Sequence, residues 1–173
     1  MAQVLIPDRP VAFGYKQVWL AIRDAKPQVV ADTLGLLHTR ASTWKEGIER
    51  AYEQGYDRER RRYRELQEIF VSPPVLGWTL AVGGIGALPE PGMGDWTPWL
   101  CNLSQILGHV QFFGTHRVSS VVAWAKAERG RIVRAYCIVD PDGRAREDAG
   151  RANADPELKY SSCSAGGSAG RWC

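Results

Sequence analysis

The stretch HVQFFGTHRVSSVVAWAKAERGRIVRAYCIV, residues 109–139, decides the fold of this chain. It is rich in Val, Ile, Phe, Trp and Tyr, the residues that favour β-strands. It divides into three runs of strand length, 109–116, 118–126 and 131–139. The sequence Glu-Arg-Gly that joins the last two runs is typical of a hairpin turn. We therefore predict three consecutive antiparallel strands.

Downstream of these strands the composition changes twice. The sequence DPDG at 140–143 predicts a second turn, in which Gly143 can adopt a positive φ, and a short last strand follows at 144–148. From about residue 150 the chain consists mostly of polar and small residues without periodicity. We therefore predict a single domain over 1–149 and a low-complexity tail without fixed structure over 150–173.

Upstream of residue 109 the pattern alternates between strands and helices. Residues 17–23, QVWLAIR, predict a strand. Residues 26–37 predict a helix, for which Asp24 is a candidate cap and Gly35 a stop. A second helix is expected to begin at residues 43–46, Thr-Trp-Lys-Glu, because they match the capping box.

The next segment, DRERRRYRELQE at residues 57–68, combines five arginines with four acidic residues. Asp57 and Arg61 lie at i,i+4 spacing and Glu59 and Arg62 at i,i+3, which would place each pair on one side of a helix. We predict a solvated amphipathic helix that extends the previous one. Because the acids cancel most of the charge, a nucleic-acid-binding arm is the less favoured interpretation.

Residues 69–83 contain Pro73 and Pro74, which lack the N–H groups that a sheet needs. They predict an edge strand, a bulge or an extended loop, followed by a regular strand at 77–82. The Gly- and Pro-rich residues 83–97 then predict a loop.

A third helix is expected over 98–107, with Thr97 as its N-cap, Pro98 in its first turn and Gly108 as its stop. The order of these elements predicts an α+β fold. We expect a mostly antiparallel sheet of about five strands, with two or three helices packed on one face.

The composition is that of a globular protein. The chain has 173 residues, of which 45% are hydrophobic, and a formal charge of +3 at pH 7. Such a small charge does not by itself indicate a nucleic-acid partner. No stretch approaches the roughly 18 apolar residues of a membrane span, and Pro7 and Pro10 interrupt the apolar N-terminal residues, unlike a signal peptide. We therefore expect a cytoplasmic protein with no membrane partner.

Two residues in the opening stretch could carry chemistry, His116 and Arg117. His116 could act as a base or ligand while Arg117 binds an anion. Strand alternation would place the two side chains on opposite faces unless the strand breaks at Gly114. The plain alternative is a strand-end histidine that bonds to the backbone and an arginine paired with a surface acid, and we favour it.

Other catalytic and cofactor patterns are weak. Ser72 and Cys101 are candidate nucleophiles, but the chain has no G-x-S-x-G sequence. The three histidines and four cysteines show no metal-binding spacing, and no Lys follows the Gly run at 83–86. We therefore expect no metal or cofactor, and we expect Cys101 and Cys137 to be reduced core residues.

Features typical of binding are stronger. Seven tryptophans are many for a chain of this length. Trp96 and Trp99 lie at a junction between a loop and a helix, where exposed aromatic residues often anchor an interface. We expect Trp96 to be the tryptophan most exposed to solvent. The tryptophans expected in the core are Trp19, Trp44, Trp78 and Trp124.

The segments IFVSPPVLGWTLAVGG, LSQILGHVQFFGTHRV, AWAK and RAYCIV resemble a family of uncharacterised bacterial single-domain proteins. The shared pattern is FVSPP, GW, THR, AWA and RAY, and the resemblance covers about residues 17–148. It implies no activity and no catalytic residues. The chain departs from the family pattern in the Arg-rich stretch at 57–68 and in the tail after residue 150.

These observations leave three functional hypotheses. The first is a non-enzymatic cytoplasmic bacterial domain that binds a protein partner, for which an immunity or adaptor role would suit a small domain without catalytic motifs. Its binding residues would be the aromatic and proline anchors of the loops and the arginines that steer an acidic partner: Trp96, Trp99, Pro73, Pro74, Arg58, Arg61 and Arg62. The second is a small hydrolase or transferase with a site around His116 and Arg117. The third is weak nucleic-acid binding through the Arg-rich helix.

Overall fold

The computed structural model describes the chain from residue 8 to residue 149, with gaps. The described ranges are 8–14, 17–52, 56–57, 62–63, 68–84, 86–90, 96–116, 121–139 and 145–149, and side chains are not described for 56–57, 62–63, 139 and 145–149. The predicted turn at 140–143 and the predicted tail at 150–173 therefore lie outside the described residues.

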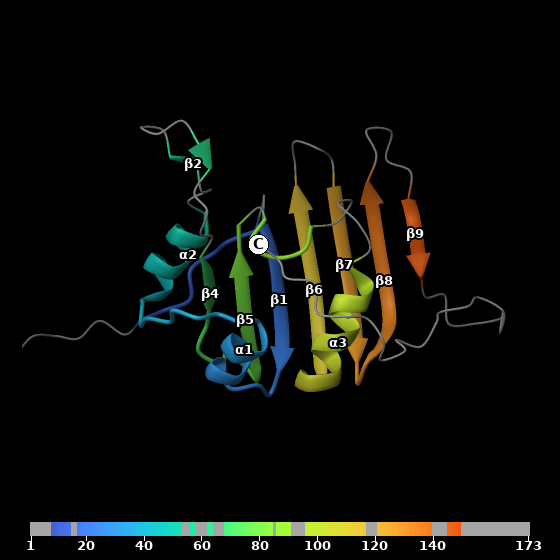
Figure 1. Ribbon diagram of the computed structural model, residues 1–173, viewed down its shortest axis with the longest axis horizontal. Helices are drawn as coiled ribbons and strands as arrows, with labels where there is room; N and C mark the ends of the chain where they lie inside the picture. The colour runs from blue at the N-terminus through green and yellow to red at the C-terminus, as the bar shows by residue number, and fades with distance from the viewer. Residues whose placement is uncertain are drawn as a thin grey trace, which may run out of the picture.

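One antiparallel sheet forms the centre of the molecule (Figure 1). It has seven strands in the order β4-β5-β1-β6-β7-β8-β9, and each neighbouring pair is antiparallel. The strands are β1 (Gln17–Arg23), β4 (Ile69–Val71), β5 (Trp78–Gly83), β6 (His109–His116), β7 (Val121–Glu128), β8 (Arg131–Val139) and β9 (Ala145–Ala149). The predicted α+β class is confirmed, with more strands than the five expected, because the short segment before Pro73 also pairs as an edge strand.

Strand β1 lies inside the sheet although it comes first in the chain. It pairs with β5 on one side and with β6 on the other, so both of its edges are hydrogen-bonded. Val18, Leu20 and Ile22 point to one side of the sheet, where they are at most 4% exposed. Trp19, Ala21 and Arg23 alternate to the other side.

Three helices flank the sheet: α1 (Pro27–Thr33), α2 (Trp44–Tyr52) and α3 (Thr97–Leu107). Helices α1 and α3 lie on one face, which is toward the viewer in Figure 1. On β7 the residues facing α3 are Ala123, Ala125 and Ala127, whose small side chains leave room for the helix. This packing confirms two helices on one face.

Helix α2 packs on the opposite face, beside the β4 edge. Trp44, Ile48 and Ala51 of the helix form a second cluster with Phe70 of β4 and Val82 of β5. The alternation of the strands places these two residues on the side away from α1 and α3. We call the face opposite α1 and α3 the open face, because α2 covers only its β4–β5 end.

The helix termini agree in part with those predicted from the sequence. In the predicted capping box, the Thr43 N–H donates to Glu46 Oε2 over 3.1 Å and the Glu46 N–H donates to Thr43 Oγ1 over 3.2 Å. The hydrogen bond from the Thr43 N–H lowers the pKa of the Glu46 carboxyl. Gly35 and Gly108 end their helices with positive φ, as predicted.

Two predicted caps are wrong. Asp24 does not cap α1, because the N-cap is Lys26 and no side chain caps it, while Asp24 turns the chain with a φ of 52°. Thr97 is already the first residue of α3, whose N-cap is Trp96. The first helix also ends at Thr33, earlier than expected.

The Arg-rich helix predicted at 57–68 is wrong. Residues Tyr56–Asp57 (β2) and Arg62–Tyr63 (β3) pair as a small antiparallel sheet of their own. Ion pairs at helical spacing contribute only about 0.2–0.5 kcal/mol each. Short isolated helices are marginal in water, so these pairs do not determine the structure.

Candidate functional site

A row of aromatic residues crosses the open face. In register it runs through Trp19 of β1, Phe113 of β6, Trp124 of β7 and Tyr136 of β8, and we call these four residues the aromatic row. The rings of Trp19 and Phe113 stack with their centroids 4.0 Å apart. The Arg134 guanidinium carbon lies 5.9 Å from the centre of the Trp124 ring. All four aromatic side chains are half-buried, so part of each remains in contact with solvent.

Covering elements reach only one end of the aromatic row. Phe13 contacts Trp19 edge-on at 5.5 Å, and α2 packs over β4 and β5. Among the described residues, no helix packs on the open side of β6, β7 and β8. Val122, next to the row on β7, is accordingly 48% exposed.

Basic residues predominate around the aromatic row among the described residues. On the part of the open face that α2 does not cover, and in its adjoining turns, the described charged side chains are five cations and two acids: Arg23, Lys126, Arg129, Arg131 and Arg134, with Asp24 and Glu128. The surface therefore has a positive potential, which favours an acidic partner.

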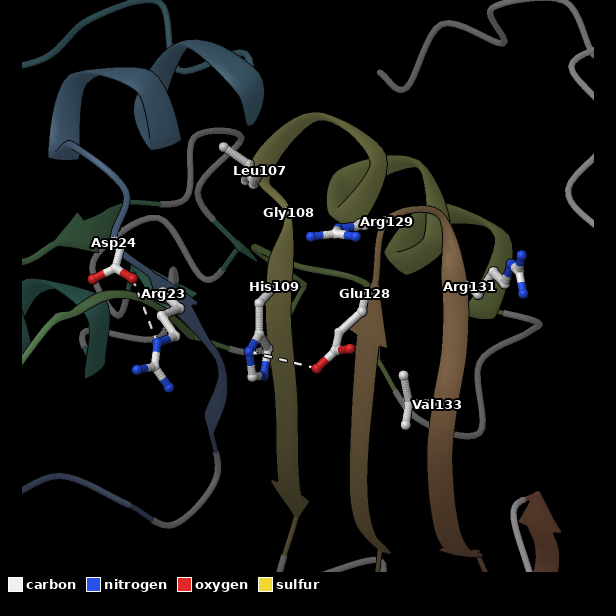
Figure 2. Close-up of a pocket in the computed structure, with 9 residues that line it drawn as sticks. All are labelled: Arg23, Asp24, Leu107, Gly108, His109, Glu128, Arg129, Arg131 and Val133. Atoms are coloured by element: carbon white, nitrogen blue, oxygen red, sulfur yellow. Dashed lines mark ion pairs between the residues drawn. The ribbon is translucent and has the colours of Figure 1, made fainter. Parts of the chain in front are cut away.

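At one end of the open face lies a hollow of about 760 Å³ (Figure 2). Its residues come from the end of β1, the end of α3, the start of β6 and the β7–β8 hairpin. They are Arg23, Asp24, Leu107, Gly108, His109, Glu128, Arg129, Arg131 and Val133. Figure 2 shows Arg23, His109 and Glu128 on three neighbouring strands, with the guanidinium of Arg129 above them and that of Arg131 pointing away.

Within the hollow, His109 and Glu128 stand opposite each other on β6 and β7. His109 Nδ1 lies 3.7 Å from Glu128 Oε1, and Lys126 Nζ lies 2.8 Å from the same oxygen. The hydrogen bond from Lys126 lowers the pKa of Glu128. Burial and the nearby Lys126 lower the pKa of His109 below 6.5, although Glu128 opposes this shift. The lowered pKa favours the neutral form of His109, and Lys126 is the main partner of Glu128.

Backbone strain concentrates at this end of the sheet. Among the described residues, three non-glycine residues have positive φ: Asp24 at 52°, Leu76 at 50° and Arg129 at 47°. Leu76 and Arg129 occupy the first central position of the β4–β5 and β7–β8 hairpin turns, where Asn, Asp or Gly is preferred. Strained residues persist where the surrounding structure holds them and often mark functional sites.

The catalytic candidates from the sequence do not form one site. Ser72 is fully buried beside the edge strand, where its hydroxyl donates to the Pro73 carbonyl over 2.8 Å and accepts the Leu80 N–H over 2.9 Å. Ser72 pairs with Leu80. The position of Ser72 lies three strands away from the strand of His116 and five residues away from it along that strand. The two residues are therefore about 14 Å apart across the sheet and about 17 Å apart along it. Cys101 is buried in α3, and Arg117 lies outside the described residues. His116 is half-buried at the end of β6, on the face of α1 and α3.

The expected position of Trp96 is wrong. Trp96 is only 5% exposed, because its ring stacks on Phe112 at 4.5 Å and joins the core beneath α3. Trp99 is half-buried against the same core. Trp96 therefore cannot serve as the exposed anchor that the sequence suggested.

The other predicted binding residues have varied positions. Pro73 and Pro74 are exposed in the β4–β5 hairpin, whose tip residue Leu76 is 95% exposed. Arg58 and Arg61 lie outside the described residues, and Arg62 is described by its backbone alone, within β3.

The sequence interpretation also missed the aromatic row. It assigned four tryptophans to the core, but only Trp44 is buried, while Trp19, Trp78 and Trp124 stand half-buried on the open face. The available signal was the alternation Ala-Trp-Ala-Lys-Ala at 123–127. Its small residues face the helix and its large ones face away, the reverse of the usual assignment.

Two further observations concern metal ions and membranes. Among the described residues, no group of three or more His, Cys, Asp or Glu side chains could hold a metal ion. No helix within the described ranges is long and apolar enough to cross a membrane.

Comparison with known proteins gave no match to a protein-family model, to a curated protein or to a solved structure. The resemblance to a family of uncharacterised bacterial proteins therefore remains a prediction.

Proposed function

We propose that this chain is a non-enzymatic domain that binds an acidic protein partner on the open face of its sheet. The observation that carries the proposal is the aromatic row, whose half-buried side chains keep part of their surface in contact with solvent across β1, β6, β7 and β8. Aromatic side chains supply much of the binding energy of protein interfaces when a partner removes them from water.

The surrounding charges support the same proposal. Five cations and two acids surround the row among the described residues, which favours association with an acidic protein surface. Arg134 combines both features, because its guanidinium is exposed and lies over the Trp124 ring. Immunity and adaptor roles, which act by covering a partner's surface, are compatible with this mode of binding, and a cytoplasmic location remains part of the proposal.

The positions of Ser72, Cys101 and His116 give no support to a hydrolase or transferase. Ser72 satisfies the backbone at the end of an edge strand, and His116 points to the face of α1 and α3. The predicted Arg-rich helix, on which nucleic-acid binding depended, is replaced by the strands β2 and β3. The protein-binding hypothesis is therefore the one that the geometry supports best.

The experiment measures binding by isothermal titration calorimetry between the full chain and each purified protein encoded beside its gene. Trp124→Ala should weaken a complex by at least about 30-fold, as expected for a buried aromatic anchor. Arg134→Glu should weaken the complex more at low salt than at high salt. Ile106→Ala, a control at an exposed apolar residue of α3, should leave the affinity unchanged.

Two results would count against the proposal. One is the absence of any complex at micromolar concentration. The other is a complex that Trp124→Ala and Arg134→Glu leave intact while Ile106→Ala weakens it.

A further inference from the structure

We propose that the hollow at the β6–β7–β8 end of the open face binds a carboxylate group of the acidic partner, between Arg129, His109 and Arg23. This inference rests on the proposed function and adds to it the chemical group that the hollow recognises. The site would receive an Asp or Glu side chain, or a chain terminus, while the aromatic row contacts apolar parts of the partner.

Arg129 has a fixed backbone and a guanidinium that faces the hollow. Its backbone is held in place, because its N–H donates to the Gly108 carbonyl over 2.9 Å and the next residue, Gly130, donates to Ser104 Oγ over 2.9 Å. Its guanidinium extends over the hollow and forms no ion pair within the described part of the chain. An arginine at a positive φ of 47° also costs stability relative to Gly or Asn. The conformation of the turn therefore does not favour Arg at position 129, whose side chain is the part that faces the hollow.

The charges that line the hollow leave an excess of positive charge. Three guanidinium groups and two carboxylates line the hollow, and Lys126 already neutralises one of those carboxylates, Glu128. Arg23 lies 3.4 Å from Asp24, so that pair is also balanced, although both side chains are largely exposed. Of the two guanidinium groups that remain, that of Arg131 points away (Figure 2), so one positive charge, on Arg129, faces the hollow and matches a singly charged carboxylate better than a doubly charged phosphate.

His109 faces the space that the carboxylate would enter, and its lowered pKa favours the neutral imidazole. The groups around it come from every neighbouring element: Arg23 at the end of β1, Asp24 after it, Trp78 on β5, Lys126 and Glu128 on β7, Arg129 in the turn and Arg131 on β8. A bound carboxylate would favour the imidazolium form, so binding should strengthen as the pH falls from 7.5 to 5.5.

The test is an NMR titration of the full chain that follows the ring signals of His109. The probe is the N-acetyl amide of glutamate, which carries one carboxylate, and the control compound is the N-acetyl amide of glutamine, which is neutral and of similar shape. The glutamate compound should shift the His109 signals to saturation and raise the pKa of His109, while the glutamine compound should not.

Two variants test the residues. Arg129→Asn suits the positive φ of the turn, so it should fold, and it should weaken glutamate-compound binding by about tenfold or more. Arg9→Ala removes an exposed arginine that does not line the hollow, and it should change binding by less than about twofold. If Arg129 only caps the carboxyl end of α3, Arg129→Asn will alter stability without altering the titration, and the inference is overturned.

Further results would overturn the inference: equal shifts with both compounds, or saturable shifts with inorganic phosphate and none with the glutamate compound. The titration contains no protein partner, so its failure is distinct from that of the proposed function. If a partner binds through Trp124 but tolerates Arg129→Asn, only this inference falls. If the carboxylate binds in the hollow but no partner is found, only the proposed function falls.

Discussion

The Ser72 hydroxyl lies where the edge strand β4 gives way to Pro73 and Pro74. It accepts the Leu80 N–H, and thus supplies an acceptor for a part-buried backbone donor at the point where the pairing of β4 with β5 ends. A hydroxyl in this position stabilises the fold. Ser72 resembles a catalytic nucleophile only in being a serine.

Ser72→Ala should therefore lower the free energy of unfolding by about 1–3 kcal/mol, because it leaves the part-buried Leu80 N–H unpaired. Urea denaturation measures the change. Ser42→Ala is the control, at a half-buried serine with no hydrogen bond to the described residues, and it should stay within about 0.5 kcal/mol of the wild type. An unchanged stability in Ser72→Ala would show that the Leu80 N–H does not depend on the hydroxyl.

The partial burial of His109 should make the stability of the folded protein depend on pH. Burial and Lys126 lower its pKa in the folded chain, whereas the unfolded chain takes up the proton near pH 6.5. Between these two values the unfolded state binds more protons, so the free energy of unfolding should fall as the pH decreases through this window.

His109→Gln should remove that part of the slope between pH 7.5 and pH 5, measured by urea denaturation at a series of pH values without added carboxylates. His38→Gln, at an exposed histidine outside the sheet, should keep the wild-type profile. A slope that survives in His109→Gln would assign the pH dependence to another group.

At the level of elements, the sequence predicted where strands lie better than it predicted which way they face. Strands β6 and β8 have the predicted bounds, because their aromatic and β-branched runs are bounded by clear turn signals. The face of Trp124 was misassigned, because alternation defines two faces and does not say which one a helix will cover. The covering helix, α3, is distant in sequence, so no local pattern contains that information.

Other predictions from local sequence were wrong where contacts between distant segments of the chain decided the structure. Trp96 lies next to a glycine- and proline-rich loop, which suggested exposure, but its ring stacks on Phe112 of β6. The salt-bridge spacing at 57–68 suggested a helix, yet Tyr56 pairs with Tyr63 across a short sheet. The candidate site was missed for the same reason, since Arg23, His109 and Glu128 come together only through strand register.

The contact between α2 and β4 is a further element-level feature. Gly47 of the helix faces Phe70 so closely that a Cβ at this position would overlap the aromatic ring. Gly→Ala in an exposed helix stabilises by about 0.5–1 kcal/mol, but here the overlap should reverse the sign.

Gly47→Ala should therefore destabilise the protein by about 1–3 kcal/mol, measured by thermal or urea unfolding. Gly14→Ala offers a matched control, because no atom lies within 4 Å of the place that the added methyl group would take, and it should be nearly neutral. A stabilised Gly47→Ala protein would show that α2 does not rest on Phe70.

At the scale of the whole molecule, the two faces of the sheet have different roles. Helices α1 and α3 bury the aliphatic and small side chains of β1, β6, β7 and β8 on one face, together with Phe112, which supplies the main core. The same strands present larger and charged side chains on the open face, where α2 reaches only the β4–β5 end. The strain in the two hairpin turns and the hollow both lie at one end of that face.

This arrangement makes the open face the surface on which a partner is expected to bind. The most direct test is fluorine NMR of the chain labelled with 5-fluorotryptophan, which gives a signal for each of its seven tryptophans. On addition of a bound partner, the account predicts that the signals of Trp124 and Trp78 shift, while those of the buried Trp44 and Trp96 stay in place. A partner that shifts the signal of Trp99 on α3 and leaves Trp124 and Trp78 unchanged would contradict the account.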